Sequence, residues 1–109
     1  MSNLNIELFE QLRILLDENF DVLINTFIED NTSRIEQLQL LIDAGQSEEV
    51  RHISHAMKSS SANIGALELS EICRQMEQDC VNNFTDVKTK YARLRTEFDA
   101  LVLCLNENR

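Results

Sequence analysis

Apolar residues recur at steps of three and four positions along almost the whole chain, which is the spacing that one face of an α-helix requires. This pattern predicts five helical segments. They are expected over about residues 5–17, from the DENFD interruption to about residue 44, over 47–65, over about 67–82, and over a last segment that contains residues 87–105. Each segment carries an apolar stripe, so each should pack one face against the others.

The last segment shows the pattern most regularly. Its apolar residues follow alternating steps of four and three: Val87, Tyr91, Leu94, Phe98, Leu101 and Leu105. In the first segment a shorter stripe is formed by Ile6, Phe9, Leu12 and Leu16. Such seams are typical of helices in bundles. We therefore expect an all-α fold, an up-down four-helix bundle with the short first helix laid across one end, as a single domain over residues 1–109.

Composition supports this expectation and marks where helices should end. The chain contains no proline and only two glycines, Gly45 and Gly65. Because glycine readily adopts the left-handed conformation that terminates helices, Gly45 should end the second helix and Gly65 the third. Ser47 is expected to be the N-cap of the third helix, with acidic residues in the first turn that complement the helix dipole.

The charge of the chain narrows the classes of partner. Nineteen Asp and Glu against ten Lys and Arg give a net charge of −9. A surface of that sign repels nucleic acid phosphates and anionic lipid headgroups, so no nucleic acid and no membrane is expected as a partner. No apolar run approaches the roughly 20 residues of a membrane span, and the start MSNLNIELFEQL lacks the features of a secretion signal. These features predict a cytoplasmic protein.

Three cysteines, Cys73, Cys80 and Cys104, form neither a CxxC pair nor an even-numbered disulfide framework. Cys73 and Cys80 are two helical turns apart and share a face with Leu69 and Met76. We expect them to pack as small core residues, because nothing nearby supplies the electropositive setting of a reactive thiol.

The stretch HAMKSSSANIGA, residues 55–66, carries the candidate chemistry. On a helical wheel, the arc that faces the core contains Val50, Ile53, Met57, Ser60, Ser61 and Ile64. His55 lies on the opposite side, with Lys58 and Ser59 about one turn onward. The imidazole should therefore be exposed beside one cation and small side chains. The three consecutive serines place small side chains on both the inner and the outer face of this helix.

An exposed imidazole of this kind suits phosphoryl transfer. Neutral imidazole is a nucleophile near pH 7, and a neighbouring cation keeps its lone pair available. Lys58 and a serine hydroxyl could then compensate the oxygens of a phosphoryl group. The chain has no Gly-rich phosphate loop and no GxxxxGK[ST] motif. A partner would therefore have to bring the phosphoryl group, the metal ion and most of the catalytic apparatus.

These residues resemble the histidine-containing phosphotransfer (HPt) domains of multistep two-component signalling. The family pattern is a histidine, x, a hydrophobic residue and Lys-Gly-Ser, with a Gly-Ala after a short stretch of small residues. Its positions are matched by His55, Met57, Lys58, Ser60, Gly65 and Ala66. The following ALELSEICRQME is similar to the next helix of the family, and FIED at 27–30 extends the resemblance. Ser59 departs from the pattern, because the family usually has glycine there.

The resemblance implies that His55 receives a phosphoryl group from a phosphoaspartate on a receiver domain and passes it to another receiver. Lys58 would stabilise the phosphoryl group, and Gly65 would close the helix that presents the site. The implied partners are receiver domains of hybrid sensor kinases and response regulators, with Mg²⁺ on the receiver and no cofactor on this chain, which would act as a monomer. Ser59 would either tighten phosphate binding or narrow the access of the receiver.

Three other interpretations compete. Glu48, His52 and His55 form one helical stripe, but three ligands in a row on one helix rarely converge on a single zinc ion. A nucleophilic pair of Ser59 and His55 is disfavoured, since a mid-helix serine has no free backbone amides to bind an oxyanion. A non-catalytic helical bundle that binds a partner as a scaffold stays open, because its surface would look much the same.

Overall fold

The computed structural model describes residues 4–109; residues 1–3 of the predicted domain lie outside the described part. The described chain is helical almost throughout. Its helices are α1 (Ile6–Leu16), α2 (Phe20–Asp43), α3 (Ser47–Asn63), α4 (Leu67–Asn82) and α5 (Val87–Asn108). Short 3-10 turns lead into α2 at Asp17–Asn19 and into α5 at Phe84–Asp86. The predicted all-α fold is confirmed, and the helix bounds differ from the predicted ones by a few residues.

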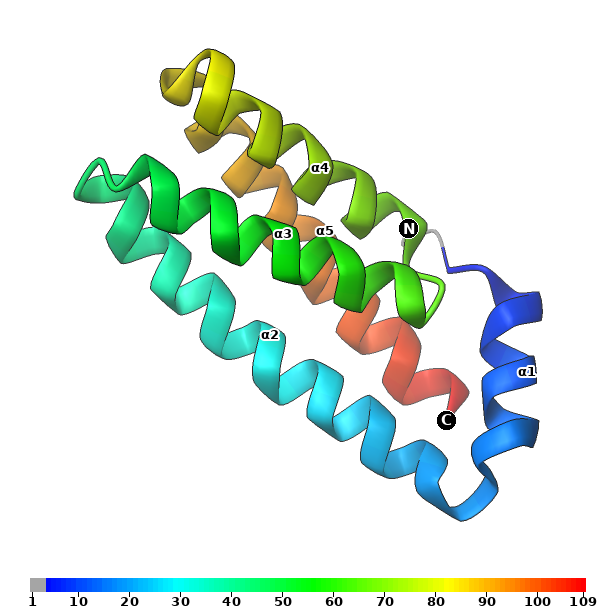
Figure 1. Cartoon of the computed structure of the whole chain (residues 1–109). Helices are drawn as coiled ribbons and strands as arrows, with labels where there is room; N and C mark the ends of the chain where they lie inside the picture. The colour runs from blue at the N-terminus through cyan, green and yellow to red at the C-terminus, as the bar shows by residue number, and fades with distance from the viewer. Residues whose placement is uncertain (1–3) are drawn as a thin grey trace.

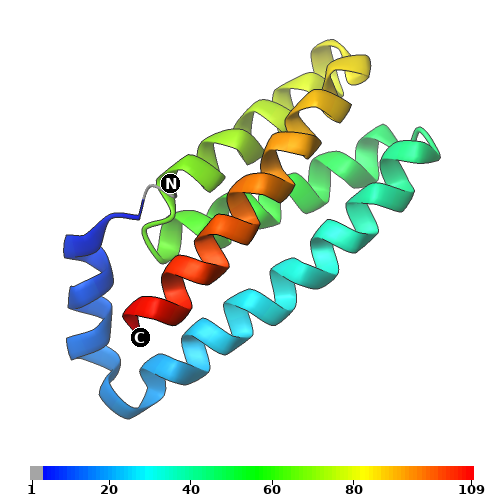
Figure 2. The ribbon, with the colours of Figure 1, turned by 180° about the vertical axis from the view of Figure 1, so that it is seen from behind.

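The four long helices run up and down beside one another, and α1 lies across one end of the bundle (Figures 1 and 2). Their inward faces form one hydrophobic cluster. The predicted seam of α5 is buried along its whole length. Burying one large apolar side chain contributes about 1.5–3 kcal/mol, so this seam is a main source of stability. No helix in residues 4–109 is both long and apolar enough to cross a membrane.

The short helix α1 closes the end of the bundle through one aromatic side chain. Phe9 is fully buried, and its ring packs edge-on against Phe20 with the centroids 5.1 Å apart. Arg13 lies over both rings and donates a hydrogen bond to the carbonyl of Asn108 at the end of α5. The expectation that Ile6 belongs to the buried stripe is wrong, because that side chain is 54% exposed at the N-terminus of α1.

Both glycines end helices, as predicted. Gly45 and Gly65 have positive φ angles of 70° and 83°. After α3, the N–H of Gly65 donates to the carbonyl of Ala62, and the N–H of Ala66 donates to that of Ser61. This pair of bonds satisfies two carbonyls that the helix end would leave unpaired. The carbonyl of Gly65 also accepts a 2.8 Å hydrogen bond from the N–H of Asn5, which ties the start of α1 to this turn.

Two serine hydroxyls set α3 against α4. Ser47 donates to the carbonyl of Cys80 at 2.8 Å, and Ser70 donates to the carbonyl of Lys58 at 3.0 Å. The predicted N-cap role of Ser47 is therefore wrong: Gln46 occupies the cap position without a side-chain bond, and the Ser47 hydroxyl is used between helices instead. Because α3 and α4 are antiparallel, these two bonds fix which residues of the two helices lie level with each other (Figure 1).

Candidate functional site

His55 stands on the outer face of α3, as the helical wheel predicted. Its side chain is 60% exposed, while Val50, Ser54 and Met57 on the same helix are buried. Ser59, one turn further along, is also exposed and small. One side of the imidazole is therefore open to an approaching macromolecule.

A glutamate on α4 holds the ring. Nδ1 of His55 lies 3.0 Å from Oε2 of Glu77, and the other carboxylate oxygen, Oε1, lies 2.6 Å from Nζ of Lys58. The Glu77 side chain is only 16% exposed, whereas that of Lys58 is 31% exposed. One largely buried carboxylate thus bridges the histidine and the lysine.

The electrostatics of Glu77 favour its ionised form. Burial of this carboxyl by itself raises its pKa, but the hydrogen bonds and charges of Lys58 and His55 outweigh burial and leave the pKa below its ordinary value of 4.5. An ionised carboxylate accepts hydrogen bonds and donates none. We therefore assign the proton to Nδ1 of His55, which leaves the lone pair on Nε2, away from Glu77.

Sequence reasoning missed Glu77. It predicted Lys58 beside the imidazole, and the structure shows that the ammonium of Lys58 pairs with the same carboxylate that contacts His55. The turn at Gly65 could have pointed to Glu77. In two antiparallel helices that are joined by a turn, residues about equally far from the turn lie near each other. His55 is ten residues before Gly65 and Glu77 is twelve after it.

The other predicted site residues have structural surroundings. The hydroxyl of Ser60 accepts a 3.2 Å hydrogen bond from the side-chain amide of Asn31, a fully buried residue of α2. Gly65 is buried in the turn against Asn5. Of the three consecutive serines, Ser61 is fully buried, Ser60 is half-buried and Ser59 is exposed, so small size serves packing on one side and access on the other.

The stripe of Glu48, His52 and His55, which the sequence analysis disfavoured as a zinc site, does not converge on one point. His52 contacts Glu48 at 3.3 Å, whereas His55 turns to Glu77 on the neighbouring helix. Among residues 4–109, no group of three His, Cys, Asp or Glu side chains is placed to hold a metal ion.

The cysteines fit the prediction of inert packing residues. All three thiols are free. Burial raises the pKa of Cys73 to about 12 and that of Cys80 to about 11. Thiolates, the reactive form, are therefore scarce at both positions near neutral pH.

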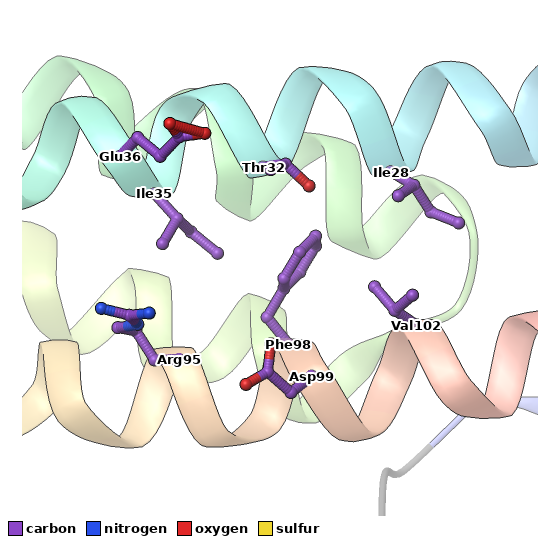
Figure 3. A pocket seen from close by; sticks show the side chains of 8 residues that line it. All are labelled: Ile28, Thr32, Ile35, Glu36, Arg95, Phe98, Asp99 and Val102. Atoms are coloured by element: carbon purple, nitrogen blue, oxygen red, sulfur yellow. The ribbon is translucent and has the colours of Figure 1, made fainter.

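The His55 cluster is a surface site and lies apart from the groove that the bundle leaves between α2 and α5 (Figure 3). That groove has an apolar floor and a charged rim; it is lined by Ile28, Thr32, Ile35, Glu36, Arg95, Phe98, Asp99 and Val102. None of His55, Lys58 and Glu77 lines it. An exposed imidazole outside this groove is suited to a reaction with a group that another macromolecule carries.

Comparisons with known structures show the same fold. The chain resembles the histidine-containing phosphotransfer protein HptB of Pseudomonas aeruginosa PAO1 with a TM-score of 0.93 and 23% identity, covering 96% of this chain and 92% of that one. It resembles the maize protein ZmHP2 with a TM-score of 0.83 and 27% identity, covering 91% and 83%. A putative phosphotransfer protein from rice gives a TM-score of 0.80 and 27% identity, covering 88% and 74%.

Two findings concern the sequence itself. No curated protein sequence matches the chain significantly. The model of the Hpt domain family, in contrast, matches residues 22–102, which span α2 to α4 and most of α5 and include His55, Lys58 and Glu77. A match over most of the chain shows that this protein belongs to the Hpt domain family.

Proposed function

We propose that His55 is the residue on which this Hpt-domain protein carries the phosphoryl group of a phosphorelay. The observation that supports the proposal most directly is the state of the ring. Nδ1 is engaged by Glu77 at 3.0 Å, and the side chain is 60% exposed. A nucleophilic nitrogen needs a free lone pair and room for the phosphorus atom, and Nε2 has both.

The bonds and charges of the transfer step can be accounted for with these groups. The Nε2 lone pair attacks the phosphorus of an aspartyl phosphate on a receiver domain, the N–P bond forms, and the P–O bond to the aspartate breaks. The aspartate carboxylate leaves with that electron pair. The imidazole keeps its Nδ1 proton throughout and becomes positively charged, and the Glu77 carboxylate beside Nδ1 stabilises this charge. Return transfer to a second receiver reverses every change.

Lys58 has an indirect role in this proposal. Its ammonium holds Oε1 of Glu77, so that Oε2 stays directed at His55. Lys58 is then a positioning residue for the carboxylate. Ser59 serves mainly by being small, because a larger side chain at this exposed position would obstruct a docking receiver.

The partners belong to the same proposal. We expect receiver domains of hybrid sensor kinases and response regulators to dock transiently around His55 and to bring the Mg²⁺ of the reaction with them. The chain would act as a monomer. Its Hpt-domain membership and the exposed position of the ring support this assignment of partner class.

A partner-binding scaffold without phosphoryl chemistry is the alternative, and a label separates the two. The native protein is mixed with a phosphorylated receiver domain and Mg²⁺ and should acquire an acid-labile, alkali-stable phosphoryl group. His55→Gln should acquire none. His52→Gln is the matched control, because His52 lies on the same helix, is exposed, and contacts Glu48 instead of Glu77. Labelling of His55→Gln at the native level would overturn the assignment, and no labelling of the native protein would favour the scaffold.

A further inference from the structure

We propose that Arg51 binds the phosphoryl group carried by His55, and that its guanidinium leaves Glu48 to do so. This inference rests on the proposed function and deepens it. It assigns the compensating cation to a residue outside the recognised sequence motif, in place of Lys58.

The register of the helices places Arg51 level with Glu77 and one turn before His55. Ser70 bonds the carbonyl of Lys58, Glu77 follows Ser70 by seven residues, and Arg51 precedes Lys58 by seven. In antiparallel helices Glu77 is therefore level with Arg51. The ring of His55 contacts the carboxylate of Glu77. Arg51 lies four residues before His55 on the same face of α3, which makes the two side chains neighbours on the helix surface.

Lys58 already forms an ion pair with the carboxylate of Glu77. Its Nζ lies 2.6 Å from Oε1 of Glu77, whose side chain is only 16% exposed. If the ammonium moved to a phosphoryl group, it would leave Oε1 of this largely buried carboxylate without its partner, which is unfavourable.

Arg51 is held much more weakly. Both nitrogens that it uses, Nε and Nη2, donate to the same oxygen of Glu48, and the Glu48 side chain is 64% exposed. That oxygen also contacts His52. Exposed pairs of this kind contribute little, whereas a guanidinium matches the geometry of phosphoryl oxygens with two parallel hydrogen bonds. The exchange of partners is therefore favourable once the phosphoryl group is present.

A second arginine near the site is less available. Arg74 on α4 binds Glu71 through two separate nitrogen–oxygen contacts, Nε to Oε1 at 2.8 Å and Nη2 to Oε2 at 2.5 Å. Such a forked pair is the stronger arrangement. The charges around Arg51 agree with its position: Glu48 raises the pKa of the Arg51 guanidinium most, and Glu77, which is level with Arg51, adds a smaller rise.

The test measures an equilibrium, because the position of an equilibrium does not depend on how well the two proteins dock. A receiver domain that labels the native protein is allowed to exchange phosphoryl groups with each variant, and the ratio of phosphohistidine to phosphoaspartate is determined. Arg51→Gln should shift this ratio toward the receiver by about threefold to tenfold, as loss of one partly exposed charge-assisted contact implies. Arg51→Lys should recover part of the shift. Glu48→Gln should shift the ratio in the opposite direction, because it removes the competing carboxylate.

Arg93→Gln is the matched control. Arg93 is an exposed arginine of α5 whose guanidinium lies 3.5 Å from Glu68, and its replacement changes the net charge equally. The ratio for this variant should equal the native one, and circular dichroism should show unchanged helicity for all variants. Equal shifts for Arg51→Gln and Arg93→Gln, or no shift for Arg51→Gln, would overturn the inference. If the native protein accepted no label, the proposed function itself would fail, which is a separate outcome.

Discussion

Glu77 is the residue on which the site depends most. It is largely buried, yet it is charged, because each of its oxygens has a partner, Lys58 on one side and His55 on the other. A buried carboxylate without partners would be protonated instead. The three residues therefore act as one unit: the lysine keeps the glutamate ionised, and the glutamate keeps the proton of the histidine on Nδ1.

This unit predicts a pH-dependent contribution to stability. The pKa of Glu77 in the folded protein lies below its ordinary value of 4.5. The stabilisation is therefore complete above that value and is lost as the pH falls through the folded pKa. Urea unfolding should show that Glu77→Gln is less stable than the native protein at pH 7, and that the difference shrinks toward pH 3.

An exposed glutamate provides the control for this measurement. Glu29 lies on the outer face of α2 and makes no ion pair with any residue in the described range, so Glu29→Gln should change stability little at either pH. A stability difference for Glu77→Gln that stays constant or grows as the pH falls would contradict the assigned ionisation.

At the scale of elements, the turn between α3 and α4 sets the geometry of the site. Gly65 ends α3, reverses the chain and accepts the hydrogen bond that ties down the start of α1. The two serine bonds then keep α3 and α4 in one register, so a residue of α4 can reach the ring on α3. The histidine is thus positioned by rigid helices and not by a mobile loop.

The two glycines allow a matched prediction. Gly45 and Gly65 both have positive φ, where a side chain is strained by about 1–2 kcal/mol. A Cβ at Gly45 would meet nothing within 4 Å, but one at Gly65 would lie 3.2 Å from both Cβ and the carbonyl oxygen of Asn5. Gly45→Ala should lower the free energy of unfolding by about 1 kcal/mol and Gly65→Ala by about 2 kcal/mol or more. Equal losses in urea unfolding would show that contact with Asn5 is unimportant.

The sequence pattern predicted the helices well and the residues at the helix ends less well. The apolar periodicity found all four long helices, and the glycines marked two helix ends, because both signals depend on residues that are neighbours along the chain. Ile6 and Ser47 were misassigned for the opposite reason. The exposure of Ile6 depends on how α1 crosses the bundle, and the hydroxyl of Ser47 is used by α4, which is remote in sequence.

At the scale of the whole molecule, the fold is an elongated bundle of 42 × 20 × 19 Å with the candidate site on the face that α3 and α4 share. At this site too, the sequence predicted what depends on residues that are neighbours along the chain, and it did not predict the contact between remote residues. The exposure of His55 follows from its place on one helix, and the wheel predicted it. Its contact with Glu77 joins residues 22 positions apart, and the turn at Gly65 could only narrow the choice on α4 to a few polar residues.

The most direct test of the central claim is to locate the phosphoryl group at atomic level. The full chain, labelled with ¹⁵N in its two histidines, is phosphorylated by a receiver domain and examined by NMR for nitrogen–phosphorus coupling. We predict one phosphoryl group per molecule, on Nε2 of His55, with the proton retained on Nδ1. Coupling to Nδ1 of that ring, or to either nitrogen of His52, would contradict the proposed site.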